Sequence, residues 1–199
     1  MKDRVTIGLL AVFGIILAAL LVGVRLEFGW AGGEGYTLQQ PVSVHMDGAR
    51  IILKRGETIR TKAGQRAKLQ FNFAHQIWLD ENTDLTVVEN TSDRVIVHLG
   101  RGRLYADTHG EKDWAKQLVV KTNAVTATIT SGALFVVNFD FLESVSVVPV
   151  ETSVQIVVKT VQPITTATPM FIHETKPISI SQSAFDANAA PDFMQFIHQ

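Results

Sequence analysis

The sequence predicts an all-β fold, an antiparallel sandwich, roll or flattened β-barrel-like domain, preceded by one N-terminal transmembrane helix. Two observations predict the β domain. Between residues 42 and 161, short runs alternate apolar and polar residues with a period of two and are rich in β-branched side chains. Gly, Asn, Asp and charged pairs separate these runs, and no long helical pattern lies between them to form the crossovers of a parallel sheet.

The strands are predicted from these runs. The clearest lie at 50–54, 67–71, 85–88, 94–99 and 124–129, and others are expected at 134–139, 144–148 and 153–161. The alternation predicts that ten large apolar side chains face the core, where burying each one contributes about 1.5–3 kcal/mol to stability. They are Leu69, Phe71, Trp78, Leu85, Val87, Ile96, Leu99, Leu104, Leu134 and Val136.

The N-terminal segment predicts a membrane anchor. Residues 5–24 carry no charge, and at about 1.5 Å per residue this run spans roughly 30 Å, the thickness of a bilayer's hydrocarbon core. A cleaved signal peptide is the alternative, although its apolar region is usually only about 7–15 residues long. Lys2 and Arg4 precede the run, which favours a cytoplasmic N-terminus and a domain that is extracytoplasmic, either periplasmic or at the cell surface.

Five segments follow from these patterns. We expect a cytoplasmic N-terminus at 1–4, the transmembrane helix at 5–24, a Gly-rich linker at 25–41 and the β domain at 42–161. The remaining residues, 162–199, contain several prolines and many Ser and Thr residues. They predict an extended tail with a short C-terminal helix at 191–197.

Composition excludes several classes of function. The formal net charge is -1, with 18 Lys and Arg against 19 Asp and Glu, so no nucleic-acid partner is expected. The cysteine count is 0, which excludes disulfides, thiolate metal sites and cysteine nucleophiles. The 6 histidines lack the spacing of metal ligands, and no serine lies in a nucleophile-elbow frame. We expect no metal, no cofactor and no catalytic residue, and hence a protein that is not an enzyme.

Short motifs between residues 56 and 158 occur in the order found in one known family. They are GETIRT at 56–61, AKLQF at 67–71, IWLDENTDLTV at 77–87, LGRGRLY at 99–105, LVVKTNA at 118–124 and SGALFVV at 131–137. This series resembles the FecR-domain family, extracytoplasmic modules of bacterial membrane-anchored regulators. The resemblance implies structural roles for Gly56, Thr61, Trp78, Leu85, Leu99, Gly100, Gly102, Gly132 and Phe135.

The sequence also departs from the family pattern. Ser131 and Ala133 stand where the family usually has Arg and Thr, and residues 73–75 replace an Asp-Gly turn. The resemblance implies signal transfer from an envelope partner to a sigma factor through a cytoplasmic arm. Only residues 1–4 precede the apolar run, so direct sigma-factor control is not expected.

A few polar residues are candidates for facing a ligand: His75, Asp80, Arg101, Arg103 and His109. The two histidines fall in predicted loops, where a solvent-facing side chain is the ordinary structural interpretation. Asp80 belongs to a carboxylate cluster that lacks the ligand spacing of a calcium loop and is interpreted as a solvated turn. The two arginines suggest an anionic polymer such as a wall glycan.

Together these features predict a single-pass protein that displays a FecR-like binding or sensing module for envelope signalling. Its partner would be an envelope or membrane protein, captured by a sheet face or an exposed edge strand. Two alternatives remain open. One is an envelope protein that binds or acts on glycans, and the other is a structural component of the envelope that self-associates.

Overall fold

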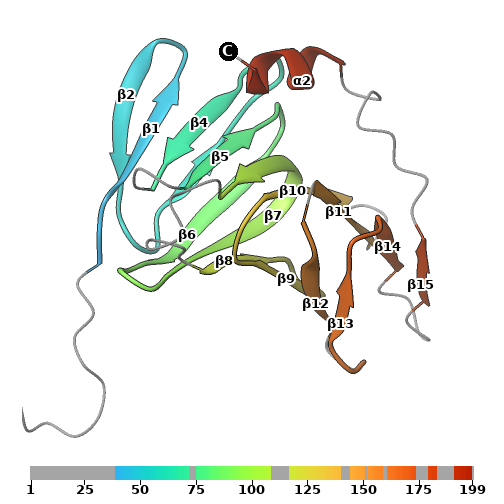
Figure 1. Ribbon diagram of the computed structural model, residues 1–199. Helices are drawn as coiled ribbons and strands as arrows, with labels where there is room; N and C mark the ends of the chain where they lie inside the picture. Colours follow the sequence, from blue (N-terminus) through green and yellow to red (C-terminus); the bar gives the residue numbers. More distant parts are fainter. Residues whose placement is uncertain are drawn as a thin grey trace, which may run out of the picture. The chain divides into compact units, whose positions relative to one another are not determined.

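Figure 1 shows the computed structural model of the protein. The structure describes residues 39–71, 75–108, 117–139, 144–150, 152–158, 161–173, 179–182 and 191–198. All of them belong to one compact unit, Leu38–Gln199. The predicted anchor at 5–24 and all but the last three residues of the predicted linker lie outside the described residues. No described helix is both long and apolar enough to cross a membrane.

Strands dominate the described residues, which confirms the predicted all-β class. The residues that the structure describes form fifteen strands and one short helix. The strands are β1 (Val42–Met46), β2 (Ala49–Leu53), β3 (Thr58–Arg60), β4 (Ala67–Gln70), β5 (Gln76–Leu79), β6 (Asp84–Asn90), β7 (Arg94–Asp107), β8 (Gln117–Lys121), β9 (Val125–Ile129), β10 (Ala133–Phe139), β11 (Ser144–Val150), β12 (Val154–Val158), β13 (Ile164–Thr166), β14 (Met170–His173) and β15 (Ser179–Gln182). The helix is α2 (Pro191–Ile197), at the position predicted for it.

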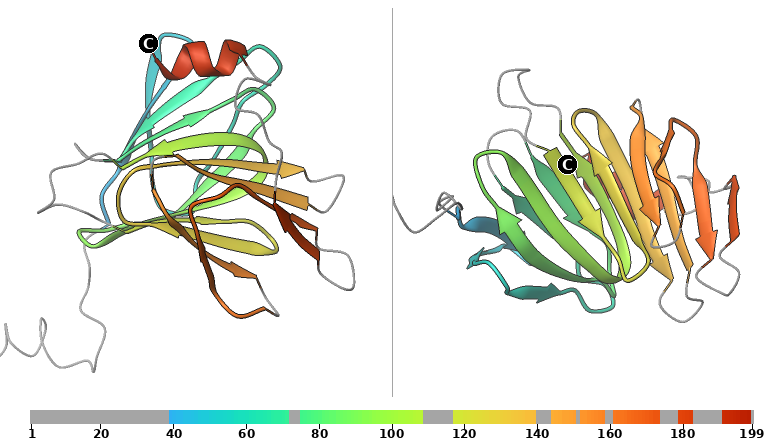
Figure 2. Two further views of the ribbon diagram at one scale, coloured as in Figure 1. Left: turned by 45° about the vertical axis from the view of Figure 1, so that its right-hand side comes forward. Right: turned by 90° about the horizontal axis from the view of Figure 1, so that it is seen from below.

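Two sheets share the long strand β7. Its first half pairs with β6 and β8 in a sheet with the order β3-β6-β7-β8-β9-β12-β13. Its second half pairs with β5 and β10 in a sheet with the order β2-β1-β4-β5-β7-β10-β11-β14-β15. In Figure 2 the shared strand β7, drawn in yellow-green, is strongly curved. The pairings are antiparallel, as predicted, except that β8 lies parallel to β7.

The main core lies between the inner faces of the two sheets. One row of opposed residues crosses five strands: Ala67, Leu79, Leu104, Val136 and Val147. All five are fully or almost fully buried. The other sheet contributes its own alternate apolar residues to the same cluster. This cluster contains eight of the ten predicted core residues: Leu69, Phe71, Leu85, Val87, Leu99, Leu104, Leu134 and Val136.

A second, smaller core lies on the outer face of one sheet, beneath α2. Its sheet-side row is Trp78, Tyr105, Phe135 and Val148, which oppose one another across β5, β7, β10 and β11. Phe193 of α2 packs edge-on against Phe135, with ring centroids 5.6 Å apart. Trp78 was predicted to face the main core, and this placement is wrong, because β5 is apolar on both of its faces. Ile96 is buried but belongs to neither core.

The predicted tail contributes to the sheets. β13 pairs with β12, and β14 and β15 extend the sheet beyond β11. Ile172 of β14 is fully buried in the main core. The stretch from residue 162 onward thus supplies three strands, of which β13 and β15 are edge strands, and the helix that covers the second core.

Candidate functional site

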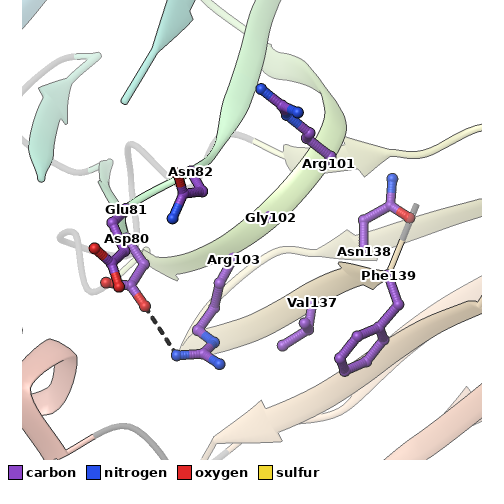
Figure 3. Close-up of a pocket in the computed structure, with 9 residues that line it drawn as sticks. All are labelled: Asp80, Glu81, Asn82, Arg101, Gly102, Arg103, Val137, Asn138 and Phe139. Carbon is purple, nitrogen blue, oxygen red and sulfur yellow. Dashed lines mark hydrogen bonds and ion pairs between the residues drawn. The ribbon is translucent and has the colours of Figure 1, made fainter. Parts of the chain in front are cut away.

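A pocket of about 510 Å³ opens where β7 passes from one sheet to the other. It lies between the turn joining β5 to β6, the bend of β7 and the end of β10. Figure 3 shows its lining residues, which are Asp80, Glu81, Asn82, Arg101, Gly102, Arg103, Val137, Asn138 and Phe139. Asp80, Glu81 and Asn82 lie on one side of this space, and Val137, Asn138 and Phe139 lie on the other (Figure 3).

The bend of β7 forms because two glycines interrupt its regular pairing. Leu85 opposes Leu99 and Asp84 opposes Arg101, so Gly100 is the additional residue of a β-bulge. Gly102 has a φ of 91°, a left-handed conformation that favours glycine. A Cβ on Gly102 would also come within 2.6 Å of the Cα of Thr83. The sequence predicted a strand that ends at residue 99, but the structure shows one strand that bends here and continues to Asp107.

Hydrogen bonds to β10 and to the β5–β6 turn stabilise the bend. The Asn138 amide Nδ2 donates to the carbonyl oxygens of Leu99 (3.0 Å) and Gly100 (2.8 Å). On the other side, the Arg103 N–H donates to Thr83 Oγ1 at 3.0 Å. The backbone groups that a bulge would leave without ladder partners are therefore bonded to side chains.

A buried carboxylate joins three segments beside the pocket. Asp80 Oδ1 lies 3.0 Å from Arg66 Nε, and its Oδ2 lies 2.8 Å from Arg103 Nη1. The Asp80 side chain is only 9% exposed, so these two guanidinium groups compensate a charge that is largely removed from water. Asp80 was interpreted as part of a solvated turn, which is wrong for this residue, whereas the neighbouring Glu81 is exposed.

Thr61 and Thr83 connect the same turn to β3. Thr61 Oγ1 donates to the Asp80 carbonyl oxygen at 2.6 Å and accepts the Thr83 N–H at 2.9 Å. Both threonines are almost fully buried. The structural role implied for Thr61 therefore has a concrete basis, since its hydroxyl holds both ends of the β5–β6 turn.

A second carboxylate lies at the rim. Asp84 Oδ2 is 3.3 Å from Arg101 Nε and 3.5 Å from Arg60 Nε. Both arginine side chains are more than half exposed, so these pairs are screened by water and contribute little to stability. Glu81 is occupied differently, because its Oε2 accepts the Gly64 N–H at 2.6 Å. The three acidic residues of this turn are thus all bonded to nearby donors.

The structure brings together three of the five residues predicted to face a ligand. Asp80, Arg101 and Arg103 line the pocket, where Asp80 and Arg103 point toward each other and Arg101 points away (Figure 3). His75 does not join them: it lies at the other end of β5 and is fully buried, so a solvent-facing loop position is wrong. His109 lies outside the described residues.

The motif residues have distinct structural positions. Leu85 and Leu99 oppose each other in the main core, and Trp78 and Phe135 lie under α2. The Gly56 N–H donates to the Val87 carbonyl oxygen at 2.7 Å. Gly132, after β9, packs against Thr152, and its carbonyl oxygen accepts the Thr108 hydroxyl at 2.7 Å.

Sequence reasoning missed several residues that build the site. Arg66, Thr83 and Asn138 make its central contacts. Thr83 lies within a motif that was recognised, but nothing local marks it as the partner of Arg103. Asn138 contacts residues 38 and 39 positions away, a pairing that only the tertiary structure reveals. Among the described residues, no group of three or more His, Asp and Glu side chains is placed to hold a metal ion.

Comparison with known proteins agrees with this fold. The sequence pattern of the family described as FecR protein matches residues 57–154. No curated protein matches the chain. Two crystal structures of a "putative anti-sigma factor" from Parabacteroides distasonis ATCC 8503 are similar to it, each with a TM-score of 0.57.

The likeness to those two structures concerns the fold alone. The identities are 15% and 16%, and the alignments cover 70% of this chain and 65% and 64% of those chains. This chain therefore spans less than two thirds of their length. The matched segment, 57–154, begins just before β3 and ends at the first residue of β12, and it includes the β7 bend and most of the pocket's framework. The family resemblance predicted from the motifs is confirmed, and the chain contains a FecR domain at residues 57–154.

Proposed function

We propose that this protein is a membrane-anchored signalling protein whose FecR domain lies outside the cytoplasm and binds an envelope or membrane protein. The match to the FecR family over residues 57–154 is the observation that carries the proposal. The fold shared with a "putative anti-sigma factor" supports a regulatory role. The uncharged run at 5–24, preceded by Lys2 and Arg4, supports an anchor with this orientation.

The chemistry of the pocket supports binding rather than catalysis. Asp80 is bonded to two guanidinium groups, and Glu81 accepts a backbone N–H. A general acid or base must be within reach of a substrate proton and hold a suitable protonation state. These two carboxylates instead hold the β5–β6 turn in place, so we propose that the protein is not an enzyme.

Membrane topology can be tested with fusions after Gln199. We expect an alkaline phosphatase fusion to be active and a green fluorescent protein fusion to be dark, with the protein retained in membranes after carbonate washing. Replacing Ile16 and Leu17 by Arg interrupts the apolar run and should release the protein from the membrane. A fluorescent fusion, or a wild-type protein released by carbonate, would contradict the anchored topology.

The partner can be identified by crosslinking from the pocket rim. A photoreactive residue at Arg101, whose side chain is 53% exposed, should form an adduct with one envelope or membrane protein. The same residue at Val157, which is 37% exposed on β12 in the other sheet, serves as the matched control. Equal labelling from both positions, or adducts with no protein, would contradict a partner at this rim.

One observation favours glycan binding as a second candidate. The amide of Asn82 and the guanidinium of Arg101 line the same pocket as the ring of Phe139. Amide and guanidinium donors beside an apolar surface suit a sugar ring. Purified wall glycan should then retain the wild-type chain and lose an Arg101→Ala variant, whereas Arg94→Ala, outside the pocket, should bind normally. Equal retention of all three chains would argue against this candidate.

A further inference from the structure

Strand β2 is an unusually exposed edge strand. Among the described residues it pairs with β1 alone, and Figures 1 and 2 show the β1–β2 hairpin at the margin of its sheet. Four of its five residues are exposed, including two large apolar side chains, Ile51 at 39% and Ile52 at 50%. Edge strands that expose apolar side chains are ready templates for pairing with another strand.

The hairpin register shows which backbone groups of β2 are directed outward. The turn has two residues, Asp47 and Gly48, both with positive φ, and it brings Met46 opposite Ala49. This closing pair exchanges hydrogen bonds, and opposed pairs along an antiparallel ladder alternate between bonded and non-bonded. The N–H and C=O groups of Arg50 and Ile52 are therefore directed away from β1.

The apolar inner row of this sheet ends at Ile51. Leu69 of β4 opposes Val44 of β1, which in turn opposes Ile51 of β2. Leu69 and Val44 are fully buried, whereas Ile51 has nothing beyond it among the described residues and is 39% exposed. An added strand with a large apolar residue opposite Ile51 would continue this row and remove the exposed surface from water.

We propose that β2 pairs in antiparallel fashion with β2 of a second copy of this chain, about a two-fold axis at Ile51. In this register Arg50 opposes Ile52 of the second copy, and Ile52 opposes Arg50 of the second copy. The outward N–H and C=O groups of both strands therefore meet. Ile51 faces Ile51 across the axis and joins the two apolar rows. The interface is isologous, because each copy presents the same strand.

The charges of Arg50 and Lys54 favour this register over the registers that are shifted by two residues. Sliding the strands by two residues in one direction places Arg50 opposite Arg50, and in the other direction places it opposite Lys54. Like charges directly opposed on a sheet are destabilising. A shift by one residue would oppose outward backbone groups to groups already bonded to β1.

The interface is small, so the dimer should be reversible. Beyond Leu53, the Lys54 N–H already donates to Glu57 Oε2 at 2.8 Å, which limits the pairing to the length of β2. Interfaces well below about 1,000 Å² are typical of weak, transient association. The proposal does not depend on the membrane anchor or on the partner proposed above.

Engineered cysteines test the register directly, because the chain has no cysteine of its own. A non-bonded antiparallel pair has its Cα atoms about 4.5 Å apart, within the range that a disulfide spans. Full-length Ile51→Cys in mild detergent should therefore form a covalent dimer under gentle oxidation. The matched control is Ile52→Cys, whose nearest counterpart in the second copy lies on a diagonal beyond about 7 Å, too far for a disulfide.

The expected result is roughly tenfold more covalent dimer for Ile51→Cys than for Ile52→Cys or for Val157→Cys, an exposed site in the other sheet. Dimers held only by residues outside β2 would crosslink the three variants without this preference and would overturn the proposal. Absence of crosslinked Ile51→Cys would overturn it as well.

A second measurement tests the strand's role in solution. Sedimentation of Ile51→Cys under reducing conditions should show a concentration-dependent dimer. The double variant that also carries Ile52→Lys should be monomeric and should not crosslink under oxidation. Lysine on an edge strand opposes strand pairing, and residue 52 is half exposed, so the fold should persist by circular dichroism. A dimer that persists in the Ile52→Lys variant, or a wild-type chain that pairs only with a different protein, would overturn the β2–β2 dimer.

Discussion

Individual residues at the β7 bend form hydrogen bonds and ion pairs that connect segments distant in the sequence. Thr83 accepts the Arg103 N–H, and Asp80 binds the Arg103 and Arg66 guanidinium groups. These contacts join the β5–β6 turn to β7 and to Arg66, which directly precedes β4. These bonds hold the β5–β6 turn and the bend of β7, which line the pocket, in place.

Gly102→Ala should be among the most damaging single substitutions. The new Cβ would come within 2.6 Å of the Thr83 Cα and 2.8 Å of the Asn82 carbonyl oxygen, at a φ of 91°. Both neighbours are backbone atoms of a hydrogen-bonded turn, so we expect a loss of at least about 3 kcal/mol in the free energy of unfolding.

Gly64→Ala is the control for this substitution. Gly64 has a φ of 75°, but no atom lies within 4 Å of the position that the alanine methyl group would take. Only the left-handed conformation is penalised there, at about 1–2 kcal/mol. Urea unfolding of the full chain measures both variants, and equal losses would show that the close approach at Thr83 is unimportant.

The Glu89–Arg94 pair should give the domain a pH-dependent stability. Glu89 Oε1 lies 2.7 Å from Arg94 Nε, and this hydrogen bond lowers the pKa of Glu89 from its ordinary value of 4.5. A lowered carboxyl pKa stabilises the folded state above the ordinary value, and this contribution is lost as the pH falls through the lowered pKa. The Arg94 side chain is 52% exposed, so the contribution should stay below about 1 kcal/mol.

Glu89→Gln tests this pH dependence. The difference in unfolding free energy between wild type and variant should be largest near neutral pH and disappear in acid, where wild-type Glu89 is protonated too. Arg94→Met should remove the same pH-dependent part. A stability difference that is unchanged at low pH would show that packing, not charge, accounts for it.

Among the secondary-structure elements, β7 and α2 determine the architecture. β7 belongs to both sheets, so its bend sets how the sheets fold over the main core. α2 is only seven residues long and would not be stable as an isolated helix. It is stable here because Phe193 and Ile197, one helical turn apart, are buried on the aromatic row of the sheet.

Phe193→Ala should release α2 while leaving the sheets folded. The loss is limited to the free energy of docking a terminal helix, so we expect about 1–3 kcal/mol, less than for a central core residue. Trp78 is 5% exposed in the same cluster and should become hydrated. Its emission should shift to the red in a chain whose other tryptophans, Trp30 and Trp114, are replaced by Phe.

Gln195→Ala provides the control, since Gln195 lies on the exposed side of α2. It should leave the emission of Trp78 unchanged. If Phe193→Ala also left this emission unchanged, the helix would not be what covers Trp78.

At the scale of the whole molecule, the C-terminal residues belong to the folded unit. The sequence led us to expect an extended tail at residues 162–199, outside the β domain. The structure gives a reason to expect otherwise, because Ile172 is fully buried in the main core and β13 and β14 cover the edges of β12 and β11.

Two truncations separate the contributions of this region. Deleting residues 183–199 removes α2 and should uncover Trp78 and Phe135, raising the binding of a hydrophobic dye while the β signal in circular dichroism persists. Deleting residues 162–199 also removes Ile172 and both edge strands, and should abolish the cooperative unfolding transition. A cooperative transition in the longer deletion would show that these strands are dispensable.

Much of the fold could be predicted because the signals are local. Alternation of apolar and β-branched residues located most of the strands, including β6, β9, β10 and β12, and the ordered motifs predicted the FecR resemblance. The short helix was predicted by the pattern that starts at Pro191. The strand β7 was predicted too short, because glycines that bend a strand and glycines that end one look the same in a sequence.

The sequence by itself determined the all-β class, the family and the approximate strands, because side-chain periodicity and motif order are properties of the chain alone. Only the tertiary structure decided which face of β5 meets the main core, because Trp78 on one face and Ile77 and Leu79 on the other are all apolar and buried. The tertiary structure also decided that Asp80 is buried and ion-paired with Arg66 and Arg103. The compensating charges of Arg66 and Arg103 lie 14 and 23 residues away, and folding alone brings them within bonding distance.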